Sequence, residues 1–255
     1  MGAGNQGALA DAPGSGNEHK IISFGHALKE YPGFEIAGYV DKDSERSIKA
    51  IEAWGGTSFC CIQHAIEDFE IDVAIMSTPD DTHYEALKEL AEYPLKLVIC
   101  EKPLCTDLQQ AREIVELYKA KGVPILVNYT RRFLPYYDEL KTRKPIFGIC
   151  NFNRGWIHSA THGIDFFNML GLKDYKLIES KCESRVWTLA VTFEGYGMWH
   201  EQRIGEQPVW PYYDKSHWHL VDNAYRFLEG REPLKCTGED ALRTLEICFE
   251  LMEGR

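Results

Sequence analysis

The sequence lacks the features that mark membrane, secreted and nucleic-acid-binding proteins. No apolar run approaches the length of about 20 residues that spans a bilayer. Residues 1–17 are small and polar, with neither the basic start nor the apolar centre of a signal peptide. Positive charge is scarce, and a formal net charge of −11 argues against nucleic acid or an anionic membrane as a partner. We therefore expect a cytoplasmic protein.

Cysteine pairs with metal-binding or redox spacing are also absent. None of the eight cysteines forms a Cys-x-x-Cys pair, and Cys60 and Cys61 are adjacent. We expect reduced cysteines that serve as small core residues, and no metal site. With 44% apolar and 26% charged residues, a chain of 255 residues can form one large domain or two small ones.

Apolar strand-like runs alternate with amphipathic helical patterns through the first half of the chain. This order predicts a doubly wound parallel sheet, that is, an α/β Rossmann-like domain over residues 1–130. The second half has strand-like runs without helices between them, which predicts an α+β domain with a mostly antiparallel sheet over residues 131–255. Two further helices close the chain and could pack back on the first domain. The predicted strands are 34–40, 71–76, 97–100, 123–127, 146–153, 177–182, 186–193 and 196–202.

A glycine-rich motif opens the chain. Gly2, Gly4 and Gly7 match the dinucleotide fingerprint G-x-G-x-x-G, with Asn5 and Gln6 between them. Glycines make the tight turn and let backbone amides approach a pyrophosphate at a helix start. Only Met1 precedes the motif, so we expect the first strand of the sheet to be missing or truncated.

Asp41 ends the strand that follows the first helix. An acidic residue at this place can bind the ribose hydroxyls of a dinucleotide. Its charge would repel a 2′-phosphate, which favours NAD and leaves NADP as the alternative. Locally, an N-cap for the helix over 44–54 explains Asp41 equally well.

Polar residues also follow the strands over 71–76 and 97–100. Thr78-Pro79 ends the first and Glu101-Lys102 the second, and Pro103 stops the strand because it has no backbone donor. The carboxyl ends of parallel strands are where ligands bind in open α/β sheets. The alternative is a charged strand end that simply faces solvent.

Three titratable residues recur at helical spacing in the second half. His158, His162 and Asp165 would share one helix face. A metal site would need a third ligand, and structural histidines are a further alternative. We favour a general base, His162, oriented by Asp165, because histidine titrates near neutral pH.

Together these motifs resemble the Gfo/Idh/MocA family of NAD(P)-dependent oxidoreductases, and Tyr129-x-Arg131-Arg132-Phe133 adds to the match. The resemblance implies hydride transfer between NAD and a hydroxyl carbon of a sugar, inositol or sugar nucleotide. It also implies a homo-oligomer formed through the second-domain sheet. It assigns catalysis to Lys102 and His162, with His158 and Asp165 as helpers. The cofactor contacts that we predict are Gly2, Gly4, Asn5, Gln6, Gly7, Asp41, Thr78, Pro79, His83, Glu101, Lys102 and Arg132.

Two other functions remain open from the sequence. The absent first strand is compatible with a catalytically weak dinucleotide-binding or interaction protein of the same fold. Tyr137-x-x-x-Lys141 has the spacing of a short-chain dehydrogenase, but this spacing is common by chance and lies in a charged segment.

Overall fold

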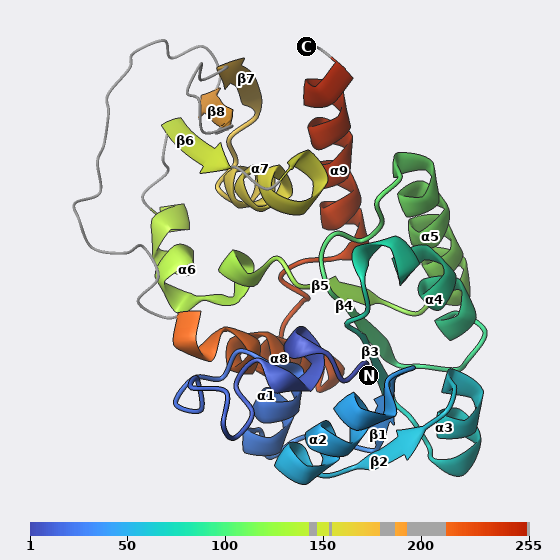
Figure 1. Ribbon diagram of the computed structural model, residues 1–255. Helices are drawn as coiled ribbons and strands as arrows, with labels where there is room; N and C mark the ends of the chain where they lie inside the picture. Colours follow the sequence, from blue (N-terminus) through green and yellow to red (C-terminus); the bar gives the residue numbers. More distant parts are fainter. Residues whose placement is uncertain (143–146, 153–154, 179–186, 193–212, 254–255) are drawn as a thin grey trace.

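The computed structural model describes residues 1–142, 147–152, 155–178, 187–192 and 213–253 (Figure 1). Parallel strands form two separate sheets in the first half, one of two strands and one of three. Each neighbouring pair is parallel, as the alternation of strands and helices predicts. The predicted sheet is therefore present as two pieces, with an interruption between β1 and β3. In sheet order the strands are β1 (Gly38–Val40) and β2 (Thr57–Phe59), then β3 (Val73–Met76), β4 (Leu97–Cys100) and β5 (Ile125–Val127).

The helices of the first half begin and end where local hydrogen bonds dictate. The side chain of Asp43 accepts the amides of Glu45 and Arg46 at one helix start, and Asp107 accepts that of Gln110 at another. Gly122, with a φ of +69°, ends the longest of these helices in the left-handed conformation. The helices are α1 (Phe24–Glu30), α2 (Ser44–Trp54), α3 (Ile62–Asp68), α4 (His83–Leu90) and α5 (Leu108–Lys121).

The main core is built around β4. All four of its residues are buried, because β3 and β5 cover its two edges and helices cover its faces. The same core includes residues from near the C-terminus, such as Leu220, Val221 and Leu245. Segments far apart in the sequence thus share one apolar interior.

The second half contains a small antiparallel sheet. Its three described strands have the order β6-β8-β7, and both neighbouring pairs are antiparallel. In Figure 1 this sheet lies beyond α7, on the far side of the molecule from β1 and β2. Part of the predicted second domain lies outside the described residues, so its full architecture stays a prediction. The elements are α6 (Pro135–Thr142), β6 (Phe147–Phe152), α7 (Thr161–Met169), β7 (Asp174–Ile178), β8 (Trp187–Thr192), α8 (Ser216–Leu228) and α9 (Gly238–Glu253).

The two closing helices pack back on the first half. α8 lies against α1, and α9 lies against α5 and α7. Just before α9 the chain pairs with β5: Val127 donates its amide to the carbonyl of Cys236 at 3.0 Å, and Leu126 forms an antiparallel bridge with Thr237. Thr237 and Asp240 cap α9 reciprocally, as their spacing predicts.

Several local predictions are wrong for identifiable reasons. The strand predicted over 34–40 is regular only at Gly38–Val40, because residues 34–36 lie beside the interruption of the sheet. Asp107 caps α5. Thr82 stands at the N-cap position of α4, but its hydroxyl donates to the carbonyl of Pro79 and accepts no amide of the helix. The short elements β2 and α3 were not predicted, and the strand predicted over 196–202 lies outside the described residues.

Candidate active site

The carboxyl ends of β3, β4 and β5 form one edge of the three-stranded sheet. Thr78 follows β3, Glu101 and Lys102 follow β4, and Asn128 follows β5. Because the three strands are parallel neighbours, these residues lie side by side. The sequence prediction that Thr78-Pro79 and Glu101-Lys102 share an edge is confirmed.

His83 connects two of these strand ends. Its Nδ1 lies 2.7 Å from the carbonyl oxygen of Pro103, and its Nε2 lies 3.0 Å from that of Thr78. The ring is fully buried. We predicted a cofactor contact for His83, but both of its nitrogens face the protein backbone. His83 therefore positions the turn that carries Lys102, and this part of the site prediction is corrected.

Lys102 meets a histidine from the second half of the chain. Its Nζ lies 3.3 Å from the Nδ1 of His158, and it donates to the carbonyl oxygen of His158 at 3.3 Å. The same Nδ1 lies 3.0 Å from a carboxylate oxygen of Asp80. Burial lowers the pKa of Lys102, whereas the charges of Asp80 and Glu101 raise it. Asp80, which the sequence analysis missed, thus counters part of the desolvation of the ammonium group.

His162 lies near the same group of charges. Its ring is half-buried, and its Nδ1 is a buried atom without a hydrogen-bond partner among the described residues. Burial lowers the pKa of His162 well below its usual value, and the positive charges of Arg131, Lys102 and His158 lower it further. The neutral imidazole is therefore the stable form at neutral pH, which is the form that a general base requires.

His158 and His162 do not lie on one continuous α-helix, contrary to the prediction. Residues Trp156–Ala160 form a π-helical turn, and the α-helix α7 begins only at Thr161. The wider turn shifts the spacing of side chains, so His158 is exposed at the surface while Nδ1 of His162 is buried. The α-helical period of 3.6 residues therefore does not hold across the junction between the π-helical turn and α7.

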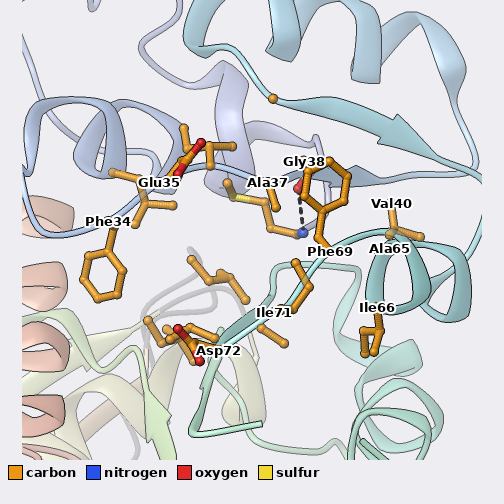
Figure 2. Close-up of a pocket in the computed structure, with 18 of the residues that line it drawn as sticks. Phe34, Glu35, Ala37, Gly38, Val40, Ala65, Ile66, Phe69, Ile71 and Asp72 are labelled. Atoms are coloured by element: carbon orange, nitrogen blue, oxygen red, sulfur yellow. Dashed lines mark hydrogen bonds between the residues drawn. The ribbon is translucent and has the colours of Figure 1, made fainter. Parts of the chain in front are cut away.

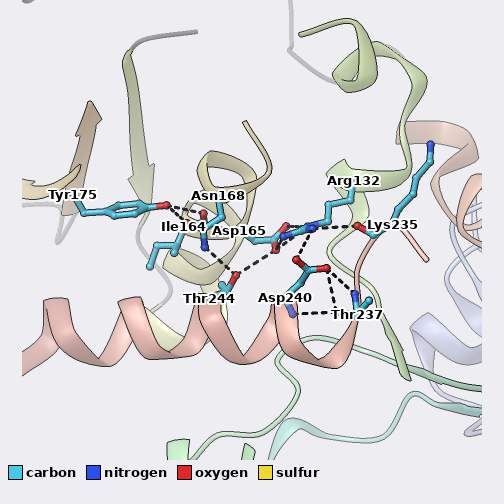
Figure 3. Close-up of polar contacts among 9 residues, drawn as sticks. All are labelled: Arg132, Ile164, Asp165, Asn168, Tyr175, Lys235, Thr237, Asp240 and Thr244. Atoms are coloured by element: carbon cyan, nitrogen blue, oxygen red, sulfur yellow. Dashed lines mark hydrogen bonds and ion pairs between the residues drawn. The ribbon is translucent and has the colours of Figure 1, made fainter. Parts of the chain in front are cut away.

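Asp165 has a different partner from the one predicted (Figure 3). Both of its carboxylate oxygens accept from Nε of Arg132 at 3.0 Å, and Thr244 donates to one of them. No hydrogen bond joins Asp165 to His162 in the described part of the chain. The orienting role assigned to Asp165 is therefore wrong here, because the carboxylate is occupied by a buried guanidinium.

Arg132 is committed to the same network. Its Nη1 donates to the carbonyl of Lys235 at 3.1 Å and lies 3.3 Å from Asp240, while its Nη2 lies 2.9 Å from Asp165. The guanidinium is buried together with its partner carboxylate. Burial raises the pKa of the Asp165 carboxyl, and the charge of Arg132 opposes that rise. Arg132, predicted to contact the cofactor, is instead a structural residue that joins the β5 end to α7 and α9.

A second buried polar network lies behind the site. The amide nitrogen of Asn128 donates to Glu101 at 2.6 Å, and Nε2 of His217 lies 3.7 Å from the same carboxylate oxygen. Glu101 is thus held from both sides, which fixes the chain just before Lys102. The position of Asn128 at a strand end was a signal for this role, whereas nothing in the sequence connected His217 to Glu101.

The glycine-rich segment lies beside the carboxyl end of β1. Ala3 donates its amide to Asp41 at 2.9 Å, so the acidic residue and the glycine motif meet as predicted. A Cβ on Gly7 would lie 1.9 Å from the carbonyl oxygen of Gly2, so only glycine fits there. By contrast, a Cβ on Gly4 would meet open space.

The helical turn that begins within the motif is short. Residues Asn5–Leu9 form a single π-helical turn, in which Ala8 and Leu9 donate to the carbonyl of Gly4. The first amides of such a turn have no partner within it and can bind an anion. Asn5 and Gln6 are exposed, so this end of the segment is accessible.

Cysteines fall into two groups. Cys100, Cys105, Cys236 and Cys248 are buried, as predicted, but Cys60 is exposed. The Sγ of Cys60 lies 3.8 Å from that of Cys61 and 3.1 Å from Nδ1 of His64. This cluster is the metal-ligand candidate within the described ranges, which the spacing analysis did not anticipate. Among the described helices, none has both the length and the apolar character needed to cross a bilayer.

Comparison with known proteins identifies the class of the first half. A family model described as "Oxidoreductase family, NAD-binding Rossmann fold" and named GFO_IDH_MocA matches residues 14–129. Residues 14–129 therefore match the Gfo/Idh/MocA family of oxidoreductases, which confirms the resemblance seen in the motifs of this part of the chain.

Curated relatives match over part of the chain. Inositol 2-dehydrogenase of Mycolicibacterium smegmatis is 42% identical over 79 residues, which are 31% of this chain and 23% of that protein. Inositol 2-dehydrogenase of Corynebacterium glutamicum strain R is 33% identical over 111 residues, 43% of this chain and 33% of that protein. The matches thus span a quarter to a third of these relatives.

Solved structures resemble the chain over nearly its whole length. A dehydrogenase from Chromobacterium violaceum has a TM-score of 0.73 at 13% identity and covers 89% of both chains. The WlbA dehydrogenase from Bordetella pertussis, solved with NADH and UDP-GlcNAcA, has a TM-score of 0.69 at 14% identity and covers 92% of this chain and 91% of its own. At such low identity these matches establish the fold alone.

Proposed function

We propose that the protein binds NAD and transfers a hydride between NAD and a hydroxyl-bearing carbon of an inositol, sugar or sugar nucleotide. The observation that carries this proposal is the meeting of Lys102 from the β4 end with His158 at 3.3 Å, with His162 in the same charge cluster. Relatives named inositol 2-dehydrogenase support the substrate class.

The residues present suit a dinucleotide. Gly4 borders open space at the start of the π-helical turn, where free amides would hold the pyrophosphate. Asp41 has lone pairs beyond those that accept from Ala3 and Asp43, so it can also accept a ribose hydroxyl. Its charge favours NAD over NADP, which bears a 2′-phosphate. Thr78 and Lys102 lie at the edge where the nicotinamide end would be held.

In this mechanism the two halves of the chain contribute different catalytic groups. When bound, NAD supplies the hydride acceptor. His162 is neutral and takes the hydroxyl proton at Nε2, since Nδ1 is buried. The ammonium of Lys102 stabilises the oxyanion that develops on the substrate oxygen. His158, held by Asp80 and exposed, orients a neighbouring substrate hydroxyl.

Replacement of Lys102 tests this assignment. The variant Lys102→Ala should lose about 10²–10⁴-fold in kcat, because the charge that stabilises the oxyanion is removed. NAD affinity, measured by thermal shift or calorimetry, should change little. Lys121→Ala, which alters an exposed lysine paired with Glu92, is the matched control. Turnover of the Lys102 variant at the normal rate would refute the proposal.

The pH dependence provides a second test. Because the pKa of His162 is lowered well below 6.5, the acid limb of kcat/KM for alcohol oxidation should lie below pH 6.5. Titration of His162 should therefore not change kcat/KM between pH 6.5 and pH 7.5. An acid limb centred above pH 7 would assign the proton transfer to another residue. His162→Asn should abolish the limb together with most of the turnover.

A second candidate function is a dinucleotide-binding protein with little turnover. The observation that favours it is the interrupted parallel sheet next to the glycine-rich segment. A thermal shift with NAD, combined with an assay of NAD reduction against inositols, sugars and nucleotide sugars, separates the two candidates. Stabilisation by NAD without reduction by any of these compounds would support the second.

The organisation of the second half is part of the same proposal. We assign residues 131–255 to a substrate domain with an α+β architecture, whose antiparallel sheet mediates self-association. The strands β6, β7 and β8 support this assignment. Neither nucleic acid nor a membrane is expected as a partner of a chain with a net charge of −11.

A further inference from the structure

Two thiols and an imidazole lie together at the carboxyl end of β2, and none of them belongs to the group around Lys102. Cys60 and Cys61 follow β2, and His64 lies in the first turn of α3. The two sulfurs are 3.8 Å apart, and Nδ1 of His64 is 3.1 Å from Sγ of Cys60. Each residue offers one ligand atom within 4.8 Å of the other two. Cys60 and His64 are exposed and Cys61 is half-buried, so solvent reaches the group.

A bend in the backbone brings the two thiols to the same side. In an extended strand the side chains of adjacent residues point to opposite faces. At Cys60 and Cys61 the chain has left β2 and bends before α3 begins at Ile62. Cys61 stands at the N-cap position of α3, but its thiol accepts no amide of the helix. The thiol of Cys61 therefore has no part in starting the helix and can bind another group.

The helix α3 holds His64 beside these thiols. Its apolar side faces inward, since Ala65, Ile66 and Phe69 line the cavity between the two parallel sheets, which has a volume of about 950 Å³ (Figure 2). Phe69 also packs edge to face against Phe59 of β2, with ring centroids 5.5 Å apart. His64 does not line the cavity and is exposed. The packing of α3 thus leaves the imidazole at the surface, next to the end of β2.

The spacing of the ligand atoms suits a tetrahedral metal ion. Zinc lies about 2.3 Å from a thiolate sulfur and about 2.0–2.1 Å from an imidazole nitrogen. At a tetrahedral angle, two such sulfurs are about 3.8 Å apart, and a sulfur and a nitrogen are about 3.5 Å apart. The two sulfurs already have this separation. The contact between Cys60 and His64 has the length of a hydrogen bond and would lengthen by about 0.4 Å when an ion replaces the proton.

The donor set and the local charge favour a thiophilic cation. Thiolates and imidazole select zinc over magnesium and calcium, which prefer oxygen ligands. Residues 60–70 include the carboxylates of Glu67, Asp68 and Glu70 and no lysine or arginine, so a cation is attracted to this segment. Within the described ranges the group has three members. Three protein ligands are the number found in open zinc sites, where water takes the fourth position.

We propose that Cys60, Cys61 and His64 bind one zinc ion, with both cysteines as thiolates and the fourth position open to solvent. Each ion that binds releases the two thiol protons to solvent, so the exchange needs neither an oxidant nor a reductant. The site shares no residue with the proposed catalytic group. This inference therefore does not depend on the dehydrogenase activity.

Zinc affinity is the first test. The full chain is reduced with a phosphine, stripped of metal and titrated with Zn²⁺ in competition with a chromophoric chelator, without NAD. It should bind one equivalent, and Cys60→Ser or Cys61→Ser should weaken binding at least about 100-fold, because even the loss of a residue that only supports a ligand costs about 10–100-fold. His19→Asn, which alters another exposed histidine, is the matched control. Affinity that stays unchanged in either cysteine variant would overturn the proposal.

Cobalt gives a direct readout of the ligands. Co²⁺ bound at this site should show a sulfur-to-cobalt charge-transfer absorption, which the double variant Cys60→Ser/Cys61→Ser should lack. His64→Asn should weaken cobalt binding, whereas His64→Cys should restore it and intensify the absorption, since a third Co–S bond forms. A histidine that only supports the fold would not be replaced in this way by a thiol. Persistence of the absorption in the double variant would place the ion elsewhere and overturn the proposal.

The stability of the metal-free variants completes the test. Because Cys60 and His64 are exposed, their substitution should change Tm by no more than about 2 °C in the absence of zinc. A loss of zinc binding at unchanged Tm then reflects the lost ligand. If Cys61→Ser lowers Tm because Cys61 is half-buried, the exposed pair Cys60→Ser and His64→Asn decides, and normal zinc affinity in both would refute the site.

Discussion

The two parallel sheets of the first half differ in how much of each strand is covered. In the three-stranded sheet, β4 is paired on both edges and all of its residues are buried. In the two-stranded sheet, β2 is largely exposed and β1 borders the cavity between the two sheets. The polar groups at the β4 end, Glu101 and Lys102, have defined partners, whereas the glycine-rich segment beside β1 rests on a single short turn.

This difference indicates what a rigid catalytic edge requires. Hydrogen bonding to a neighbouring strand on both sides fixes where a strand ends. The residue that follows the strand is then held in a defined position. Lys102 has this support from β4 and from the networks of Glu101 and His83. Asp41 follows a strand paired to a partner strand on one side only, so its position depends on local contacts with Ala3 and Asp43.

The largest difference between the sheets is expected in core stability. Leu97→Ala, in β4, should lower the free energy of unfolding by about 2–5 kcal/mol, because it leaves a cavity in a closed core. Ile36→Ala should cost about 1 kcal/mol, because Ile36 is half-buried and already lines the cavity between the two sheets. Urea denaturation measures both values. Equal losses would show that the two sheets are equally well packed.

A smaller effect should depend on pH and come from the two-stranded sheet. The amine of Met1 has a pKa near 8.0 when unfolded and about 6 when folded. Between these values the unfolded chain binds the extra proton, so the free energy of unfolding should rise by about 2 kcal/mol from pH 6 to pH 8. Acetylation of the amine should remove this part of the rise. The contribution of the amine to the pH dependence can thus be distinguished from that of His162. The same slope before and after acetylation would contradict the assigned burial.

The smallest effect concerns helix caps, where the two sheets should behave alike. Asp43→Ala at α2 and Asp107→Ala at α5 should each cost about 1 kcal/mol, measured by thermal or urea unfolding. Each cap satisfies amides within its own first turn, so the sheet beneath should make little difference. A much larger loss at Asp43 would indicate that α2 is what keeps β1 and β2 in place.

Sequence reasoning recovered those parts of the fold that depend on local pattern. The strand over 97–100 and the helix over 44–54 follow from an apolar run and an amphipathic period, and both have the predicted bounds. Likewise, a strand that ends in Glu-Lys-Pro placed Lys102 at the edge of the sheet. These features depend on residues that are close together in the chain.

The errors at the site concern contacts between distant residues or departures from the regular helix. The partner of Asp165 is Arg132, 33 residues away, and no local pattern distinguishes it from His162. The π-helical turn before α7 changed the relation of His158 to His162. The contact of Glu101 with His217 joins a strand end to a helix near the C-terminus, which the sequence could not indicate.

The outer edge of β5 contrasts with the edge of β3 that has no strand partner among the described residues. There, Cys236 and Thr237 form backbone contacts with Val127 and Leu126, so the C-terminal segment closes the sheet on that side. An uncovered parallel edge is a template on which a neighbouring molecule can pair. Removal of residues 236–253 would therefore do more than delete a helix: it would leave a sheet open at both margins and make the truncated protein prone to aggregate.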